Sequence, residues 1–163
     1  MSIILSPVTD SNRAQIEALK VKGNQKDFIE TTVQCLKESD ELSLWRPVGI
    51  YDNTLLIGFA MYGLWIYEGE NGRVWLDRFL IDERYQHQGY GEKVLMKLIN
   101  EIFNQYKYDN IFLSLYDTNR VAEHLYLKFG FSYNGELDIN GENVMMLNKR
   151  TFVQYMEAQN RQD

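Results

Sequence analysis

A short glycine-containing segment, Gln86-His87-Gln88-Gly89-Tyr90-Gly91, is the part of the sequence best suited to bind an anion. It lies between an apolar run that ends near Ile81 and a helical pattern that starts near Glu92. A strand that leads through glycines into a helix presents backbone N–H groups to an anion, and glycine lets that anion approach closely. The spacing matches neither the Rossmann fingerprint nor a Walker loop. On these residues alone, the segment is either a phosphate-binding loop or an ordinary turn that begins a helix.

Tyr126 is a candidate general acid. It lies two turns after Asn119, which is placed to start a short helix. If the strands before this helix and before the glycine segment are parallel neighbours, both helices start at the same end of the sheet. A tyrosine hydroxyl can protonate a departing thiolate through hydrogen bonding and return of a proton from solvent. The alternative is a core aromatic residue, since Tyr126 shares helical spacing with Ala122, Leu125 and Phe129.

Asp77 is an acid inside an apolar strand-like run. Such a position is uncommon unless the carboxylate is paired or functional. Asp77 is therefore either a group that contacts a cationic substrate or a carboxylate that pairs with a neighbouring cation. Arg78 is expected on the opposite face of the strand. Strict alternation places four side chains on one face: Trp75, Asp77, Phe79 and Ile81.

The histidines and the cysteine do not form a metal-binding pattern. His87 and His124 are too far apart and too isolated to suggest a ligand pair. Cys35, the single cysteine, cannot form an internal disulfide and lies among helix-like apolar residues. We expect no metal site and no thiol nucleophile.

The hydrophobic pattern predicts a mixed α/β fold. Asn-Gly and similar turn signals between three β-prone runs indicate an antiparallel meander. The clearest helix carries one apolar stripe over residues 92–105. Helices are expected at 10–20, 27–37, 92–105 and 121–129. Strands are expected at 48–51, 55–65, 73–81, 111–116, 131–137 and 144–147, after an apolar start at 3–5.

Length and charge limit the function classes. The chain has 163 residues, 45% of them hydrophobic, which predicts a single domain over 1–150 and a polar tail over 151–163. That tail contains Phe152, Tyr155 and Met156, which can dock on the body or on a second subunit. No run approaches the roughly 20 apolar residues of a membrane span, so we expect a cytoplasmic protein without a membrane partner. The net charge of −6 argues against nucleic acid and favours a small cationic partner.

Two motifs together resemble the GNAT superfamily of N-acetyltransferases. They are Gln86-x-x-Gly89-x-Gly91 after a strand, and Asn119-x-x-Ala122-x-x-Leu125-Tyr126-x-x-x-Gly130-Phe131 farther along. The resemblance implies a GNAT fold over almost the whole chain: a central, mostly antiparallel mixed sheet of six to seven strands, about four helices, and a splayed parallel strand pair at the cofactor site. Several segments resemble bacterial spermine/spermidine acetyltransferases, among them Gly72-Arg73-Val74-Trp75-Leu76-Asp77-Arg78-Phe79 and Asn134-Gly135-Glu136-Leu137-Asp138.

The resemblance also implies roles for residues that match the motifs. Tyr126 matches the tyrosine that protonates the leaving thiolate, and Asp77 lies where polyamine acetyltransferases have an acid that takes the proton from the amine. Aspartate here replaces the glutamate of some relatives and has a shorter reach. Acetyl-CoA is the implied acetyl donor. The implied cofactor-binding residues are Phe79, Leu80, Ile81, Gln86, His87, Gln88, Gly89, Tyr90, Gly91, Glu92, Asn119 and Lys128.

The expected reaction is direct transfer from acetyl-CoA to a polyamine amine in a ternary complex. Acidic and aromatic side chains are needed for the remaining ammonium groups. The substrate-binding candidates are Glu30, Glu38, Glu41, Trp45 and Asp77, with Asp40, Glu68, Glu70, Trp65 and Tyr67 as further members of the group. Two alternatives stay open: another amine acceptor, such as an aminoglycoside, an amino acid or a protein amine, and a non-catalytic acyl-CoA sensor. A homodimer is possible, as is frequent in this family.

Overall fold

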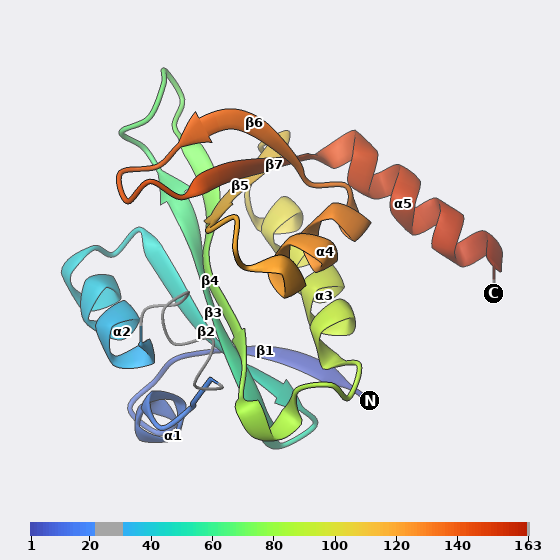
Figure 1. The fold of residues 1–163 in the computed structure, drawn as a ribbon. Coiled ribbons are helices and arrows are strands. Elements are labelled where there is room, and N and C mark those ends of the chain that lie inside the picture. Colours follow the sequence, from blue (N-terminus) through green and yellow to red (C-terminus); the bar gives the residue numbers. More distant parts are fainter. Residues whose placement is uncertain (22–30, 163) are drawn as a thin grey trace.

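A seven-stranded sheet with the strand order β1-β2-β3-β4-β5-β7-β6 forms the centre of the molecule (Figure 1). The computed structural model describes residues 1–21 and 31–162. Neighbouring strands are antiparallel except β4 and β5, which confirms the expected mixed, mostly antiparallel sheet. The strands are β1 (Ile3–Pro7), β2 (Trp45–Asp52), β3 (Leu55–Trp65), β4 (Arg73–Ile81), β5 (Asn110–Leu115), β6 (Ser132–Leu137) and β7 (Asn143–Asn148).

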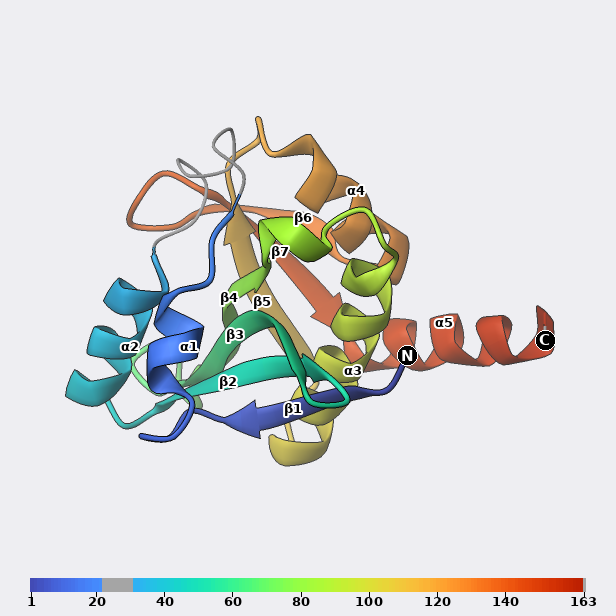
Figure 2. The ribbon, with the colours of Figure 1, turned by 90° about the horizontal axis from the view of Figure 1, so that it is seen from below.

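Helices cover both faces of the sheet. Figure 2 shows α1 (Arg13–Glu17) and α2 (Thr32–Glu41) on one side and α3 (Tyr90–Gln105) on the other. The larger core cluster lies between the sheet and the helices α3 and α4 (Arg120–Phe129), and the smaller one lies beneath α1 and α2. A short 3-10 turn, Glu83–Tyr85, follows β4. In the described ranges no helix is long and apolar enough to cross a membrane.

The C-terminal residues form a helix, α5 (Lys149–Gln162), where the sequence indicated only a polar tail. Phe152 is 3% exposed and packs against Phe103, with ring centroids 5.9 Å apart. Tyr155 packs against Phe129 at 4.9 Å. The first turns of α5 are therefore docked on the body, while its distal end projects away from the sheet (Figure 1).

The N-terminal helices differ from the sequence-based boundaries. The helix expected at 10–20 is shorter, and the helix expected at 27–37 lies partly outside the described residues. The described helix α2 begins after Thr31, whose side chain forms a reciprocal capping box with Gln34. The acidic stretch 38–41 lies beyond the expected helix end at 37 and forms the last turn of α2. Asp40 forms a salt bridge of 2.8 Å with Arg13 of α1. This pairing offsets the unfavourable interaction of an acid with the negative end of the helix dipole.

A β-bulge at Asp77 overturns the expected alternation along β4. Met61 pairs with Arg78, and the next residue of β3, Tyr62, pairs with Leu76, so Asp77 is the extra residue. Leu76 and Phe79 consequently both contact the larger core cluster, although strict alternation would place them on opposite faces. Trp75 packs instead on Phe112, at 5.6 Å, on the other side of the sheet.

The parallel strands β4 and β5 separate soon after they meet. Their ladder in the described chain consists of the pairs Val74↔Ile111 and Trp75↔Phe112. Beyond the bulge, β4 continues to Ile81 beside β3, while β5 continues beside β7. The two strands therefore open a gap at their carboxyl ends, which matches the expected splayed pair.

Docking of α5 is tested by Phe152→Ala. Removing a buried phenylalanine side chain should lower the free energy of unfolding by about 3 kcal/mol. The control is Val153→Ala on the same helix, whose side chain is 43% exposed and should change stability by no more than about 0.5 kcal/mol. Urea denaturation followed by circular dichroism measures both. Equal, small effects of the two substitutions would contradict the docked position of α5.

Candidate active site

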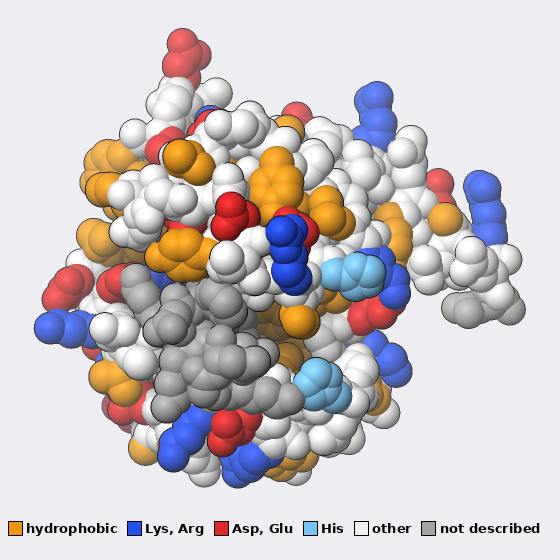
Figure 3. All heavy atoms as spheres, in the orientation of Figure 1, with side chains coloured by type: hydrophobic (Ala, Val, Ile, Leu, Met, Phe, Trp, Pro, Cys, Tyr) orange, Lys and Arg blue, Asp and Glu red, His pale blue; other side chains and the backbone are white. Residues whose placement is uncertain are grey.

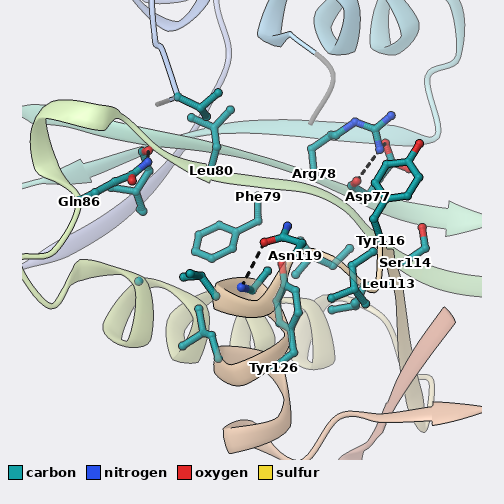
Figure 4. A pocket seen from close by; sticks show the side chains of 18 of the residues that line it. Asp77, Arg78, Phe79, Leu80, Gln86, Leu113, Ser114, Tyr116, Asn119 and Tyr126 are labelled. Carbon is teal, nitrogen blue, oxygen red and sulfur yellow. Dashed lines mark hydrogen bonds and ion pairs between the residues drawn. The ribbon is translucent and has the colours of Figure 1, made fainter. Parts of the chain in front are cut away.

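A cavity of about 680 Å³ occupies the gap between the splayed strands. Its walls come from β4, β5, the start of α3, and α4. On the face shown in Figure 3, a recess with hydrophobic side chains lies near the centre, with charged side chains along its rim. In Figure 4, Gln86 lies at one end of the pocket and Asp77, Arg78 and Tyr116 at the other. Such a concave site with a few polar groups is the usual form of a ligand pocket.

The glycine segment has the geometry of an anion-binding loop. His87 and Gly89 both adopt left-handed backbone conformations, with φ of 61° and 83°. Gly89 is the N-cap of α3, and no side chain caps the N–H groups that follow. A Cβ placed on Gly89 would meet nothing within 4 Å, so the space in front of the helix is open. These donors at the positive helix end suit a pyrophosphate.

Two acids, the buried Asp82 and the partly exposed Asp52, connect this loop to the rest of the fold. Asp82 is 1% exposed and accepts hydrogen bonds from the backbone N–H groups of Arg84 and Lys20, each at 3.0 Å. Burial raises its pKa, but the hydrogen bonds of Arg84 and Lys20 outweigh burial and lower it overall. Tyr90 donates to Asp52 at 2.7 Å. Sequence reasoning missed both acids because Lys20, which donates to Asp82, and Tyr90, which donates to Asp52, lie far from them in the chain.

Tyr126 and Asn119 face the cavity from α4. The Asn119 side chain caps α4 by accepting the N–H of Ala122 at 3.4 Å, and Gly130 ends the helix with φ of 104°. Tyr126 is 9% exposed and its ring lies edge-on to Phe131 at 5.6 Å. Burial raises the pKa of Tyr126, so its hydroxyl stays protonated at neutral pH and can donate a proton. Its side chain is both part of the core and part of the cavity wall.

Asp77 and Arg78 form the other end of the pocket. The Arg78 guanidinium lies 3.3 Å from the Asp77 carboxylate and donates to the Asp77 carbonyl at 2.6 Å. Figure 4 shows Tyr116 and Ser114 beside this pair. The expectation that Asp77 pairs with a neighbouring cation is confirmed, and its place in the cavity wall keeps the functional role open as well.

Comparison with known proteins decides the family. The profile described as "Acetyltransferase (GNAT) family" matches residues 9–131. The chain belongs to the GNAT family. Spermine/spermidine N(1)-acetyltransferase of Bacillus subtilis (strain 168) is 50% identical over 149 residues, which cover 90% of this chain and 98% of that protein. A protein named probable spermine N(1)-acetyltransferase, from Bacillus subtilis subsp. natto (strain BEST195), is 49% identical over the same shares of both chains.

Solved structures support the GNAT fold. Aminoglycoside acetyltransferase AAC(6')-Ib in complex with coenzyme A superposes with a TM-score of 0.77 at 18% identity, over 94% of this chain and 98% of that one. Spermidine N-acetyltransferase from Vibrio cholerae, in complex with CoA and spermine, gives a TM-score of 0.71 at 18% identity, over 93% and 98%. At this identity the likeness concerns the fold. Acetyl-CoA is the acetyl donor of the GNAT family.

The structure brings most of the predicted GNAT cofactor residues to one cavity. Gln88, Glu92 and Lys128 are outside its wall. Glu92 and Lys128 form a surface salt bridge of 2.9 Å between α3 and α4, and Gln88 donates to the Arg84 carbonyl at 3.1 Å. Those that line the cavity are Phe79, Leu80, Ile81, Gln86, His87, Gly89, Tyr90, Gly91 and Asn119.

The predicted amine-binding residues are less concentrated. Gln34 of α2 lines the cavity, and Glu38 and Glu41 follow it at helical spacing on the same face of α2. Trp45 lies outside the wall and stacks on Trp65 at 5.9 Å. Glu30 falls outside the described residues.

Other members of the acidic and aromatic group are also engaged away from the cavity. Glu68 and Glu136 both pair with Arg73, at 3.4 and 2.8 Å. Tyr67 packs on Trp65 at 5.2 Å, and Glu70 lies in the same β3–β4 loop. None of these residues is in the described cavity wall. In the same described ranges, no group of three or more His, Cys, Asp or Glu side chains is placed to hold a metal ion. Cys35 lies on the buried side of α2 and is 1% exposed.

Sequence reasoning missed several cavity residues, among them Ser114, Tyr116, Asn140 and Glu142. Strands were expected at 131–137 and 144–147, but the acid in the turn between them was not recognised as a site residue. Burial raises the pKa of Glu142 to about 7, helped by a hydrogen bond and repulsion from Asp138, while Arg78 opposes the shift. A strongly perturbed carboxyl in a cleft is typical of functional sites.

Gly89→Ala tests the anion-binding loop. Alanine at φ of 83° should cost about 1–2 kcal/mol of stability and weaken binding of coenzyme A at least about tenfold, because relieving the strain turns the N–H groups away from the phosphates. Gly69→Ala is a matched control: Gly69 has φ of 66°, equally open surroundings and no place in the cavity wall. Calorimetric titration with coenzyme A should show a loss only for Gly89→Ala. An equal affinity in both variants would contradict the assignment.

Proposed function

We propose that this GNAT enzyme transfers the acetyl group of acetyl-CoA to a primary amine of spermine or spermidine. The observation that carries the proposal is one cavity with an anion-binding loop at one end and carboxyl groups at the other. The 50% identity to a protein named spermine/spermidine N(1)-acetyltransferase, over 90% of this chain, supports the substrate class. The net charge of −6 is favourable for a polycation.

Residues at different positions along the cavity have different roles. When bound, acetyl-CoA supplies an activated thioester. The first N–H groups of α3 hold the pyrophosphate, and Gly89 and Gly91 keep the approach open. The backbone of β4 from Phe79 to Ile81 borders the gap left by β5 and offers hydrogen bonds to the pantetheine arm. Tyr126 lies between the two ends and donates a proton to the departing thiolate (Figure 4).

The amine end binds the cationic substrate. Asp77 lines the cavity and contacts the amine that is acetylated, while its carboxylate is shared with Arg78. Glu38 and Glu41 continue from the cavity along α2 and attract the other ammonium groups. That Asp77 itself takes the proton stays a prediction, as do the homodimer and the cytoplasmic location.

The proposed substrate class is tested by a thiol-release assay with acetyl-CoA and a panel of amines: spermine, spermidine, putrescine, an aminoglycoside and a lysine peptide. Spermine and spermidine should give the highest kcat/KM, and KM should rise with salt because the attraction is electrostatic. If only another amine is acetylated, the acetyltransferase activity is confirmed and a polyamine as its substrate is ruled out. Binding of coenzyme A without turnover of any amine would favour a sensor.

Tyr126→Phe tests the general acid. Loss of the hydroxyl should lower kcat roughly 10²- to 10⁴-fold, with little change in KM for acetyl-CoA, because the buried ring is retained. Tyr133→Phe removes the hydroxyl that donates to Glu123 on the surface and should leave kcat unchanged. Steady-state kinetics with spermidine compares the two. An unchanged kcat in Tyr126→Phe would remove this residue from the chemistry.

A further inference from the structure

Glu142 projects into the amine end of the cavity from the hairpin that joins β6 to β7. Its side chain is half-buried and lines the pocket together with Asp77, Arg78 and Tyr116. The Ser114 hydroxyl of β5 donates to a Glu142 carboxylate oxygen at 3.4 Å. Glu142 therefore faces the gap between the splayed strands, on the side where the substrate amine must enter.

Burial and the neighbouring Asp138 together raise the pKa of Glu142. The Asp138 carboxylate accepts the backbone N–H groups of Asn140 and Glu142, each at 2.9 Å, and these bonds close the hairpin. Burial raises the pKa of Asp138, but hydrogen bonds from the Glu142 side chain and backbone outweigh burial and lower it. Asp138 thus keeps the negative charge, and Glu142 holds the proton that the two carboxyls share. A pair of carboxyls whose pKa values are pushed apart is the pattern of acid–base sites.

The two carboxyls at the amine end differ in their partners. Asp77 is in contact with the Arg78 guanidinium, 3.3 Å away. Glu142 is hydrogen-bonded to the Asp138 carboxyl, and Arg78 affects the pKa of Glu142 less than Asp138 does. Tyr116 is the other titratable side chain that lines this end of the described cavity. The environment of Glu142 favours binding of a proton, whereas the Asp77 carboxylate is paired with a guanidinium.

We infer that Glu142, in place of the Asp77 that the family resemblance implies, is the catalytic residue that takes the proton from the substrate ammonium, and that Asp77 with Arg78 positions the amine. This inference rests on the proposed function and deepens it, since it assigns the base of the same reaction. Nothing in the sequence motifs indicated this role for Glu142.

The proton balance of the step is complete. The ionised Glu142 removes one proton from the ammonium and passes it to solvent. The neutral nitrogen forms the bond to the carbonyl carbon, and the bond between that carbon and sulfur breaks. Tyr126 gives its proton to the sulfur, and the second proton lost from nitrogen returns through solvent to Tyr126. One proton is released for each acetyl group transferred.

The strength of Glu142 as a base suits a reaction at neutral pH. A general base works best when its pKa lies near the working pH, and the pKa of Glu142 is raised to about 7. The base is active only when ionised, so kcat/KM for the amine should rise as the pH increases through about 7. The neighbours of the Glu142 carboxyl are Asp138, Arg78 and Ser114. Burial is the largest cause of its raised pKa, and Asp138 is the second.

The test is the pH profile of kcat/KM for the best amine of the panel, compared among wild type, Glu142→Gln and Asp77→Asn. Glu142→Gln should lower kcat/KM at pH 7 roughly 10²-fold or more and abolish the rise near pH 7. Asp77→Asn should raise KM for the amine but keep that rise. A rise that persists in Glu142→Gln, or that disappears in Asp77→Asn alone, overturns the inference.

The comparison uses whichever amine wild type acetylates fastest, so a failure of the polyamine assignment is recognised separately from a failure of Glu142. Affinity for coenzyme A and the melting temperature at pH 8 should be unchanged or higher in Glu142→Gln. In wild type the neutral Glu142 carboxyl favours the folded state, and this contribution is lost as the carboxyl ionises above about pH 7. The uncharged amide of Glu142→Gln does not ionise and avoids that loss of stability.

A second measurement needs no turnover. Carbon NMR of protein labelled with ¹³C-glutamate should show one carboxyl that titrates near pH 7 and is missing in Glu142→Gln. A midpoint for Glu142 near the ordinary value of 4.5 would overturn the inference even if the variant is inactive.

Discussion

The early separation of β4 from β5 is the constraint on which the site depends. Two paired residues on each strand hold the parallel pair together. Beyond the bulge at Asp77, β4 stays paired with β3 and β5 stays paired with β7, but the two strands no longer pair with each other. Backbone N–H and C=O groups require hydrogen-bond partners, so an opened strand pair offers them to a ligand. The loops and helices that follow the two strands then face each other across the gap. The anion loop and Tyr126 reach one cavity for this reason.

The same bulge places charge beside an apolar wall. Leu76 and Phe79 both return to the core, and Asp77 and Arg78 are left at the rim of the gap, where they line the cavity. The hairpin before β7 brings Glu142 to the same rim through a turn closed by Asp138. Positive helix-end donors and the carboxyl groups therefore lie at opposite ends of one pocket, as a reaction between an anionic donor and a cationic acceptor requires.

Local patterns predicted the elements better than their contacts. The strands at 55–65 and 73–81 have the expected bounds, and α3 begins only two residues early because Gly89 serves as its cap. The bulge at Asp77 was not predictable from β4 alone, since it exists only in the register with β3. Glu142 was missed for a similar reason: its neighbours Ser114 and Arg78 come from strands distant in sequence. The segment that forms α5 was expected only as a polar tail because most of its residues are polar, yet it is a helix that docks on the body through Phe152.

Direct transfer requires that acetyl-CoA and the amine occupy this cavity together. Initial rates measured against acetyl-CoA at several fixed concentrations of spermidine test it most directly. Direct transfer predicts intersecting double-reciprocal lines and no release of coenzyme A without amine, because Cys35 is buried away from the cavity. Parallel lines, together with a burst of coenzyme A before amine is added, would show an acyl-enzyme and contradict direct transfer.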